Sequence, residues 1–115
     1  MNTHSAIQWQ PLCATGELLE NAGVPALYQG KQIALFYVPG EQPGVYATGN
    51  WDPIGRANVL SRGIVGDIGG ELVVASPLYK QHFSLRSGRC LEDESVAVPV
   101  YDVKVDGSQV LIASR

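Results

Sequence analysis

The most informative segment of the sequence is Ser76-Pro77-Leu78-Tyr79-Lys80-Gln81-His82-Phe83-Ser84-Leu85-Arg86-Ser87-Gly88. Phe83 and Leu85 alternate with polar residues, which predicts a short strand with one buried face. Pro77 restricts the backbone of the preceding loop, and Gly88 suits the tight turn that follows the strand. The stretch therefore predicts a polar loop that leads into the core and then turns back sharply.

The rest of the chain repeats this pattern of short apolar runs between Gly, Pro, Asn and Asp. One short helix is expected at residues 16–22, ended by Gly23 and Pro25, and the glycine-rich residues 63–70 are expected to form a loop and turn. Asp106-Gly107 predicts a hairpin with a type I′ turn. Many short strands with frequent turns favour an all-β sandwich or barrel. The expected strands are residues 7–13, 26–28, 32–38, 45–48, 71–75, 82–85, 98–105 and 109–113.

Length and composition limit what the chain can be. Its 115 residues fit a single domain, 1–115. The net charge of −3 comes without a basic stripe, which argues against a nucleic-acid partner. Charged residues make up 17% of the chain, fewer than usual, which suggests a surface partly covered by a partner. The longest apolar run, 33–38, is too short to span a membrane, and with only two cysteines and no secretory signal we expect a cytoplasmic protein.

Residues 76–88 resemble the second cluster-binding segment of a Rieske iron–sulfur domain, which reads Cys-Pro-x-His-Gly, a spacer, then Phe-x-Leu-x-x-Gly. The frame of Pro77, Phe83, Leu85 and Gly88 is kept. Ser76 stands at the cysteine position and Tyr79 at the histidine position. The resemblance implies a Rieske-like fold of short antiparallel strands with at most one short helix.

The first cluster-binding segment of that family, Cys-Pro-His-x-Gly, is matched by Asn50-Trp51-Asp52-Pro53-Ile54-Gly55. If Pro53 is the family proline, Asp52 takes the cysteine position and Ile54 the histidine position. Alignment on the later Leu60-Ser61-Arg62-Gly63 step shifts these positions to Pro53 and Gly55. Neither choice supplies a thiolate or an imidazole.

A Rieske centre needs two thiolates on one iron and two imidazoles on the other. The chain has two cysteines, Cys13 and Cys90, and two histidines, His4 and His82. None falls on a ligand position, and no local Cys-x-x-Cys or His-x-x-x-His pair exists to chelate a metal. We therefore expect neither a metal site nor a catalytic residue on this chain.

A Rieske-like domain without ligands resembles the small subunit of NAD(P)H-dependent, sirohaem-type assimilatory nitrite reductase. The runs at 59–67, 74–83 and 88–93 carry this resemblance together with the Asp52-Pro53 step. It implies a large-subunit partner that carries FAD, a [4Fe–4S] cluster and sirohaem and reduces nitrite to ammonium. Two alternatives remain: a stand-alone Rieske-type ferredoxin-like electron carrier, and a metal-free β-sandwich that binds other proteins.

The resemblance also indicates where a partner would dock. Trp51, Tyr79, Lys80 and His82 fall on the loops that would surround a Rieske cluster, so they are the candidate docking residues. Two structural alternatives stay open. Tyr79 could instead fill the space left by the cluster, and Trp51 could pack beneath the opposite loop.

Overall fold

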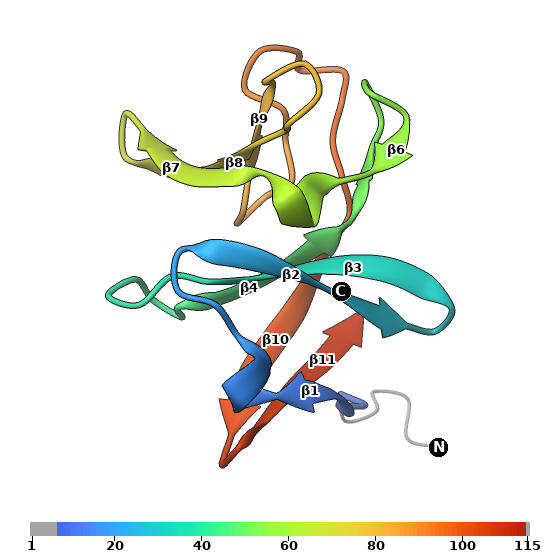
Figure 1. The fold of residues 1–115 in the computed structure, drawn as a ribbon, viewed down its shortest axis with the longest axis vertical. Coiled ribbons are helices and arrows are strands. Elements are labelled where there is room, and N and C mark those ends of the chain that lie inside the picture. Colours follow the sequence, from blue (N-terminus) through green and yellow to red (C-terminus); the bar gives the residue numbers. More distant parts are fainter. Residues whose placement is uncertain (1–6, 115) are drawn as a thin grey trace, which may run out of the picture.

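The computed structural model describes residues 7–114, which form an antiparallel β structure without an α-helix (Figure 1). The prediction of an all-β fold with at most one short helix is confirmed. The strands are β1 (Gln10–Ala14), β2 (Ala22–Tyr28), β3 (Lys31–Tyr37), β4 (Val45–Gly49), β5 (Trp51–Asp52), β6 (Ala57–Asn58), β7 (Ile64–Ile68), β8 (Glu71–Ala75), β9 (His82–Ser84), β10 (Val100–Asp106) and β11 (Gln109–Ser114), with single 3-10 turns η1 (Thr15–Glu17) and η2 (Leu60–Arg62).

Six strands form one large sheet, and the chain between β4 and β10 forms a second layer above it. The large sheet has the order β1-β11-β10-β4-β3-β2. The second layer holds the short hairpin β5–β6 and the sheet β7-β8-β9, at the upper end of Figure 1. Its entry and exit are held together, because the Gly49 N–H donates to the Pro99 carbonyl at 2.9 Å.

Strand β3 contributes to two hydrophobic clusters, one on each face. Ile33 and Leu35 pack with Val110 and Ile112 inside the curved large sheet. Side chains alternate along a strand, so Ala34 and Phe36 face the other way. They join a second cluster between the two layers, which includes Phe83, Leu85 and Leu72. This second cluster fixes the upper layer, and its loops, on the large sheet.

The expected helix at residues 16–22 is wrong. Only the 3-10 turn η1 forms, and strand β2 already begins at Ala22. Gly23 pairs with Phe36 in the sheet. A Cβ there would come within 2.6 Å of the Ser61 carbonyl oxygen and 2.7 Å of Phe36 Cε1. The glycine therefore permits close packing and does not end a helix.

Two expectations about turns and loops also need correction. Residues 64–68 are strand β7, paired along their whole length with β8, and not a loop. The hairpin after β10 turns through Gly107-Ser108, where only Gly107 has a positive φ (64°). The type I′ pattern occurs instead at Gln29-Gly30, with φ values of 52° and 77° between paired Tyr28 and Lys31.

Candidate functional site

Two loops of the upper layer meet through a pair of fully buried polar side chains. Asp52 ends β5 and Ser76 directly follows β8, and both are 0% exposed. The Ser76 hydroxyl donates a hydrogen bond to Asp52 Oδ2. Neither Pro53 nor Gly55 makes this contact, which favours the alignment anchored on Pro53. The two loops, which we call the first loop (52–55) and the second loop (76–81), are thus tied together directly.

Each of the two residues also organises its own loop. Asp52 Oδ1 accepts hydrogen bonds from the N–H groups of Ile54 at 2.8 Å and Gly55 at 3.0 Å. Ser76 Oγ accepts one from the Leu78 N–H at 3.3 Å, and its carbonyl accepts one from the Lys80 N–H at 3.1 Å. A buried carboxylate is stable only with such partners. The Asp52 carboxylate has three of them.

Leu78 closes the space between the loops. A Cβ added to Gly55 would collide with Leu78 Cδ1 and lie 2.9 Å from Asp52 Oδ2. Ile54 packs against the cluster between the layers. Tyr79 is 64% exposed, so the alternative in which Tyr79 fills this space is wrong. The sequence pattern gave no sign that Leu78 has this role.

The residues at the four ligand-related positions do not fit a Rieske cluster. They offer one carboxylate, one aliphatic side chain, one hydroxyl and one exposed phenol: Asp52, Ile54, Ser76 and Tyr79. At the two cysteine positions, the Ser76 hydroxyl is hydrogen-bonded to the Asp52 carboxylate. Within residues 7–114, no three of His, Cys, Asp and Glu gather in a way that could hold a metal ion. His4 lies outside the described residues.

His82 is held beside the second loop by Glu92, a contact that the sequence did not reveal because ten residues separate them. Glu92 Oε2 lies 2.6 Å from His82 Nδ1, and Oε1 accepts the His82 N–H at 2.8 Å. Burial alone would raise the pKa of Glu92, but the hydrogen bonds and charge of His82, together with the hydrogen bond from Cys90, lower that pKa overall. Burial raises the pKa of the nearby Cys90 thiol.

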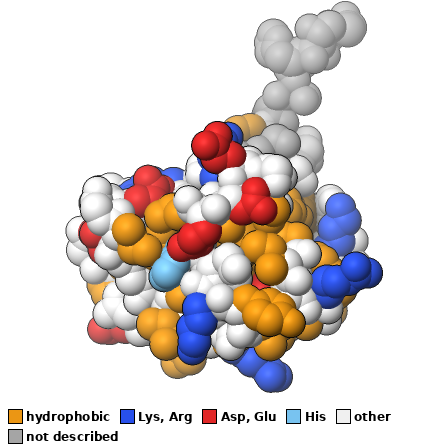
Figure 2. Space-filling view, turned by 90° about the horizontal axis from the view of Figure 1, so that it is seen from above, with side chains coloured by type: hydrophobic (Ala, Val, Ile, Leu, Met, Phe, Trp, Pro, Cys, Tyr) orange, Lys and Arg blue, Asp and Glu red, His pale blue; other side chains and the backbone are white. Residues whose placement is uncertain are grey.

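Large apolar side chains are exposed around the two loops. Trp51 is 49%, Leu78 44% and Tyr79 64% exposed, and Lys80 is also exposed. Figure 2 looks down on this end of the molecule and shows hydrophobic side chains across it, with Lys and Arg side chains along part of the rim. Exposed apolar area of this kind is typical of protein interaction sites. Because about half of its surface is exposed, Trp51 is only partly packed against the rest of the fold.

The architecture and the two facing loops define a Rieske-like domain. The family model described as Rieske-like [2Fe-2S] domain matches residues 8–113, nearly the whole chain. No helix within residues 7–114 is long and apolar enough to cross a membrane.

Individual relatives show where the chain belongs within the Rieske-like family. The chain is 47% identical to the nitrite reductase (NADH) small subunit of Salmonella typhimurium over 85% of this chain and 90% of that one. It is 40% identical to Escherichia coli NirD, whose NMR structure superimposes with a TM-score of 0.81 over 93% of this chain and 96% of that one. It is 44% identical to part of the nitrite reductase [NAD(P)H] large subunit of Klebsiella oxytoca, over 93% of this chain and 11% of that one. The chain belongs to the Rieske-like domain family and, within it, to the nitrite reductase small subunits.

Proposed function

We propose that this chain is a single docking domain that binds the large subunit of an NAD(P)H-dependent nitrite reductase and supports the reduction of nitrite to ammonium there. The observation that carries the proposal is the pair of facing loops closed by the Asp52–Ser76 hydrogen bond. The loops keep a defined shape although their residues do not fit a cluster. Their exposed side chains are then available for contact with a protein.

The relatives support the choice of partner. Small-subunit relatives match along nearly their whole length. In the Klebsiella oxytoca large subunit the similar segment is part of a much longer chain. A domain that occurs both as a separate subunit and as part of the larger chain is expected to pack against the remainder of that enzyme.

The redox groups belong to the partner in this proposal. The chain itself carries no cofactor, and FAD, the [4Fe–4S] cluster and sirohaem reside on the large subunit in the cytoplasm. The role of this chain is to stabilise or shape the redox site by binding, and no electron passes through it.

The docking surface of the proposal consists of Trp51, Tyr79, Lys80 and His82. Trp and Tyr are favoured as interface anchors because each buries a large area and keeps one polar group for hydrogen bonding. Glu92 fixes the orientation of His82. Because Tyr79 is 64% exposed, its removal changes the surface without opening the core.

Co-purification with the large subunit tests this proposal. We expect the tagged chain to retain the large subunit, and Tyr79→Ala to weaken that binding about tenfold, as removal of an interface anchor does. Val105→Ala, an exposed apolar residue on β10, is the matched control and should bind normally. Failure of the wild-type chain to retain the large subunit would refute the proposal.

A visible absorption spectrum of anaerobically purified protein separates the docking role from the electron-carrier alternative. The docking proposal expects a colourless, iron-free protein. Absorption bands of a [2Fe–2S] cluster, with two iron atoms per chain, would support the carrier instead.

A further inference from the structure

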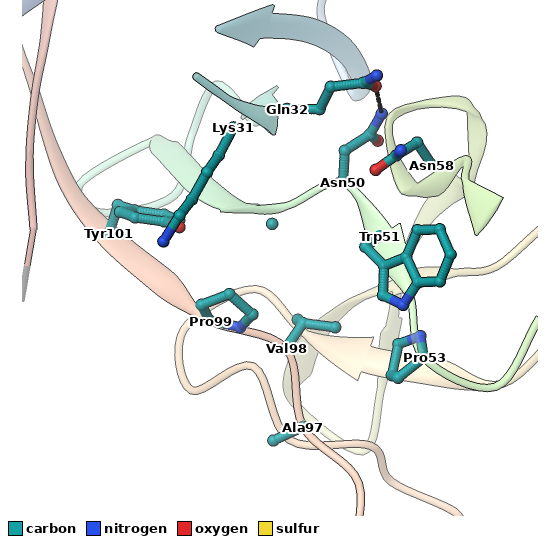
Figure 3. Close-up of a pocket in the computed structure, with 11 residues that line it drawn as sticks. Lys31, Gln32, Asn50, Trp51, Pro53, Asn58, Ala97, Val98, Pro99 and Tyr101 are labelled. Atoms are coloured by element: carbon teal, nitrogen blue, oxygen red, sulfur yellow. Dashed lines mark hydrogen bonds between the residues drawn. The ribbon is translucent and has the colours of Figure 1, made fainter. Parts of the chain in front are cut away.

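A pocket opens beside the first loop, between the ends of the large sheet and the upper layer. Its volume is about 360 Å³, at the lower end of the range for ligand pockets. Figure 3 shows Lys31 and Tyr101 on one side, Trp51 and Pro53 on the other, and Val98 and Pro99 between them. Most of this lining is apolar, and none of it takes part in the Asp52–Ser76 contact.

Lys31 gives the pocket its charge. It is the one charged residue in the lining, and it is exposed. No carboxylate among residues 7–114 forms an ion pair with it. The side chain extends along one side of the pocket, with its amine pointing toward Tyr101 (Figure 3). A ligand suited to this site combines an apolar group, held between Trp51 and Tyr101, with a negative charge near Lys31 Nζ.

The pocket is continuous with the proposed docking surface. Trp51 belongs to both, and Pro53, which lines the pocket, lies in the first loop next to Asp52. A protein that covers Trp51 and the first loop therefore lies at the edge of the pocket. A segment of that protein is a better match than a free small molecule, because the pocket forms one side of an exposed apolar surface.

We infer that this pocket binds a segment of the large subunit that carries an apolar side chain close to an aspartate or glutamate. The apolar side chain inserts between Trp51 and Tyr101, and the carboxylate pairs with Lys31. The inference rests on the proposed function and adds a second contact and its chemistry. Lys31 and Tyr101 become binding residues that the Rieske-like motifs do not indicate.

Charge reversal at Lys31 tests the electrostatic part of the inference. We would measure binding of purified large subunit to wild type, Lys31→Glu and Lys104→Glu by biolayer interferometry at low and high salt. Lys104 lies on β10 and contacts Trp9 at the other end of the sheet, so it controls for the change in net charge. Lys31→Glu should weaken binding about tenfold at low salt and less at about 0.5 M salt, where charges are screened. Lys104→Glu should change it by less than about twofold.

Photo-crosslinking identifies the occupant. A benzoylphenylalanine in place of Ala97, an exposed lining residue, is placed to react with whatever fills the pocket. The inference expects a crosslink to an acidic, apolar segment of the large subunit, mapped by mass spectrometry. A crosslink to a second copy of this chain would overturn it.

The variants also separate this inference from the proposed function. If Tyr79→Ala weakens binding while Lys31→Glu matches Lys104→Glu, the pocket is not a contact, and only the inference fails. If the wild-type chain does not bind the large subunit at all, both fail.

Discussion

At the scale of single residues, Asp52 connects more of the site than any other side chain described here. Its buried carboxylate accepts hydrogen bonds from two N–H groups of its own loop and from Ser76 of the facing loop. A metal cluster would cross-link two such loops covalently. Here the same connection is made by one hydrogen bond with a fully buried donor and acceptor.

Removal of this carboxylate should be costly. Asp52→Ala leaves the buried Ser76 hydroxyl and the part-buried N–H groups of Ile54 and Gly55 without this partner, so we expect the free energy of unfolding to fall by about 3 kcal/mol. Ser76→Ala should cost about 1–2 kcal/mol, and the double variant should cost less than the sum because the two residues interact. Urea unfolding measures all three. Ser95→Ala, which breaks a similar bond to exposed Asp93, is the control and should cost under about 0.5 kcal/mol. Strict additivity of Asp52 and Ser76 would contradict their coupling.

The contact between Gly55 and Leu78 allows a second test. Gly55→Ala places a methyl group against Leu78 Cδ1 and should destabilise the fold by about 1–3 kcal/mol. Gly66→Ala, where a Cβ meets nothing within 4 Å, provides the comparison. Adding Leu78→Ala to Gly55→Ala should recover part of the loss, as measured by thermal unfolding. No recovery would mean that Leu78 does not close the loops.

The His82–Glu92 contact predicts a defined pH dependence. The pKa of Glu92 is lower in the folded state than in the unfolded chain, so the ionised carboxylate stabilises the fold. This stabilisation is complete above the unfolded pKa, about 4.3, and is lost as the pH falls through the lowered folded pKa. The stability difference between wild type and Glu92→Gln, measured by urea unfolding, should therefore shrink as the pH falls below about 4. A stability difference that grows on acidification would show that folding does not lower the pKa of Glu92.

At the scale of elements, the loops around Asp52 and Ser76 should behave as ordered structure. The Ile54 and Gly55 amides donate to the buried Asp52 carboxylate, whereas the Gly70 amide makes an equivalent bond to Asp67 in an exposed turn. Hydrogen exchange followed by NMR should show slow exchange at 54 and 55 and fast exchange at 70, because protection requires burial as well as a bond. Asp52→Ala should abolish the difference. Equal rates in the wild-type chain would show that the first loop is open.

The elements also show how far the sequence predicts the fold. The sequence predicts strand β8 at its observed bounds. Both ends of β3 and the C-terminal end of β9 are predicted to within one residue. These strands are predictable because turn residues bound their apolar runs. Strand β7 was missed because its glycines resemble a loop, although pairing with β8 supplies its hydrogen bonds. The expected helix at residues 16–22 does not form. Gly23 is instead needed for close packing against Ser61, a contact between distant parts of the chain.

The sequence motif indicates that Asp52 and Ser76 occupy related positions, but it does not indicate the other contacts around them. The motif placed Ser76 and Asp52 at corresponding positions of two facing loops, and the structure brings them together. Leu78 as the closing residue, Glu92 as the partner of His82 and the pocket at Lys31 all depend on three-dimensional packing. The assignment of docking residues and the single-domain boundary stay predictions.

At the level of the whole molecule, we propose that this small β domain uses the end formed by its two loops to bind a larger redox enzyme. The first and second loops face each other although they lack the side chains that would bind a cluster. The exposed side chains of Trp51 and Tyr79 lie around them. We propose that binding to the large subunit, without iron on this chain, is sufficient for its role.

The most direct measurement is a titration of purified large subunit with this chain, in which NAD(P)H-dependent nitrite consumption and the iron content of the small chain are recorded together. We expect that activity rises and saturates at a fixed ratio of the two chains while the small chain contains no iron. Activity that is unchanged by the small chain, or that rises only when the small chain carries iron, would contradict it.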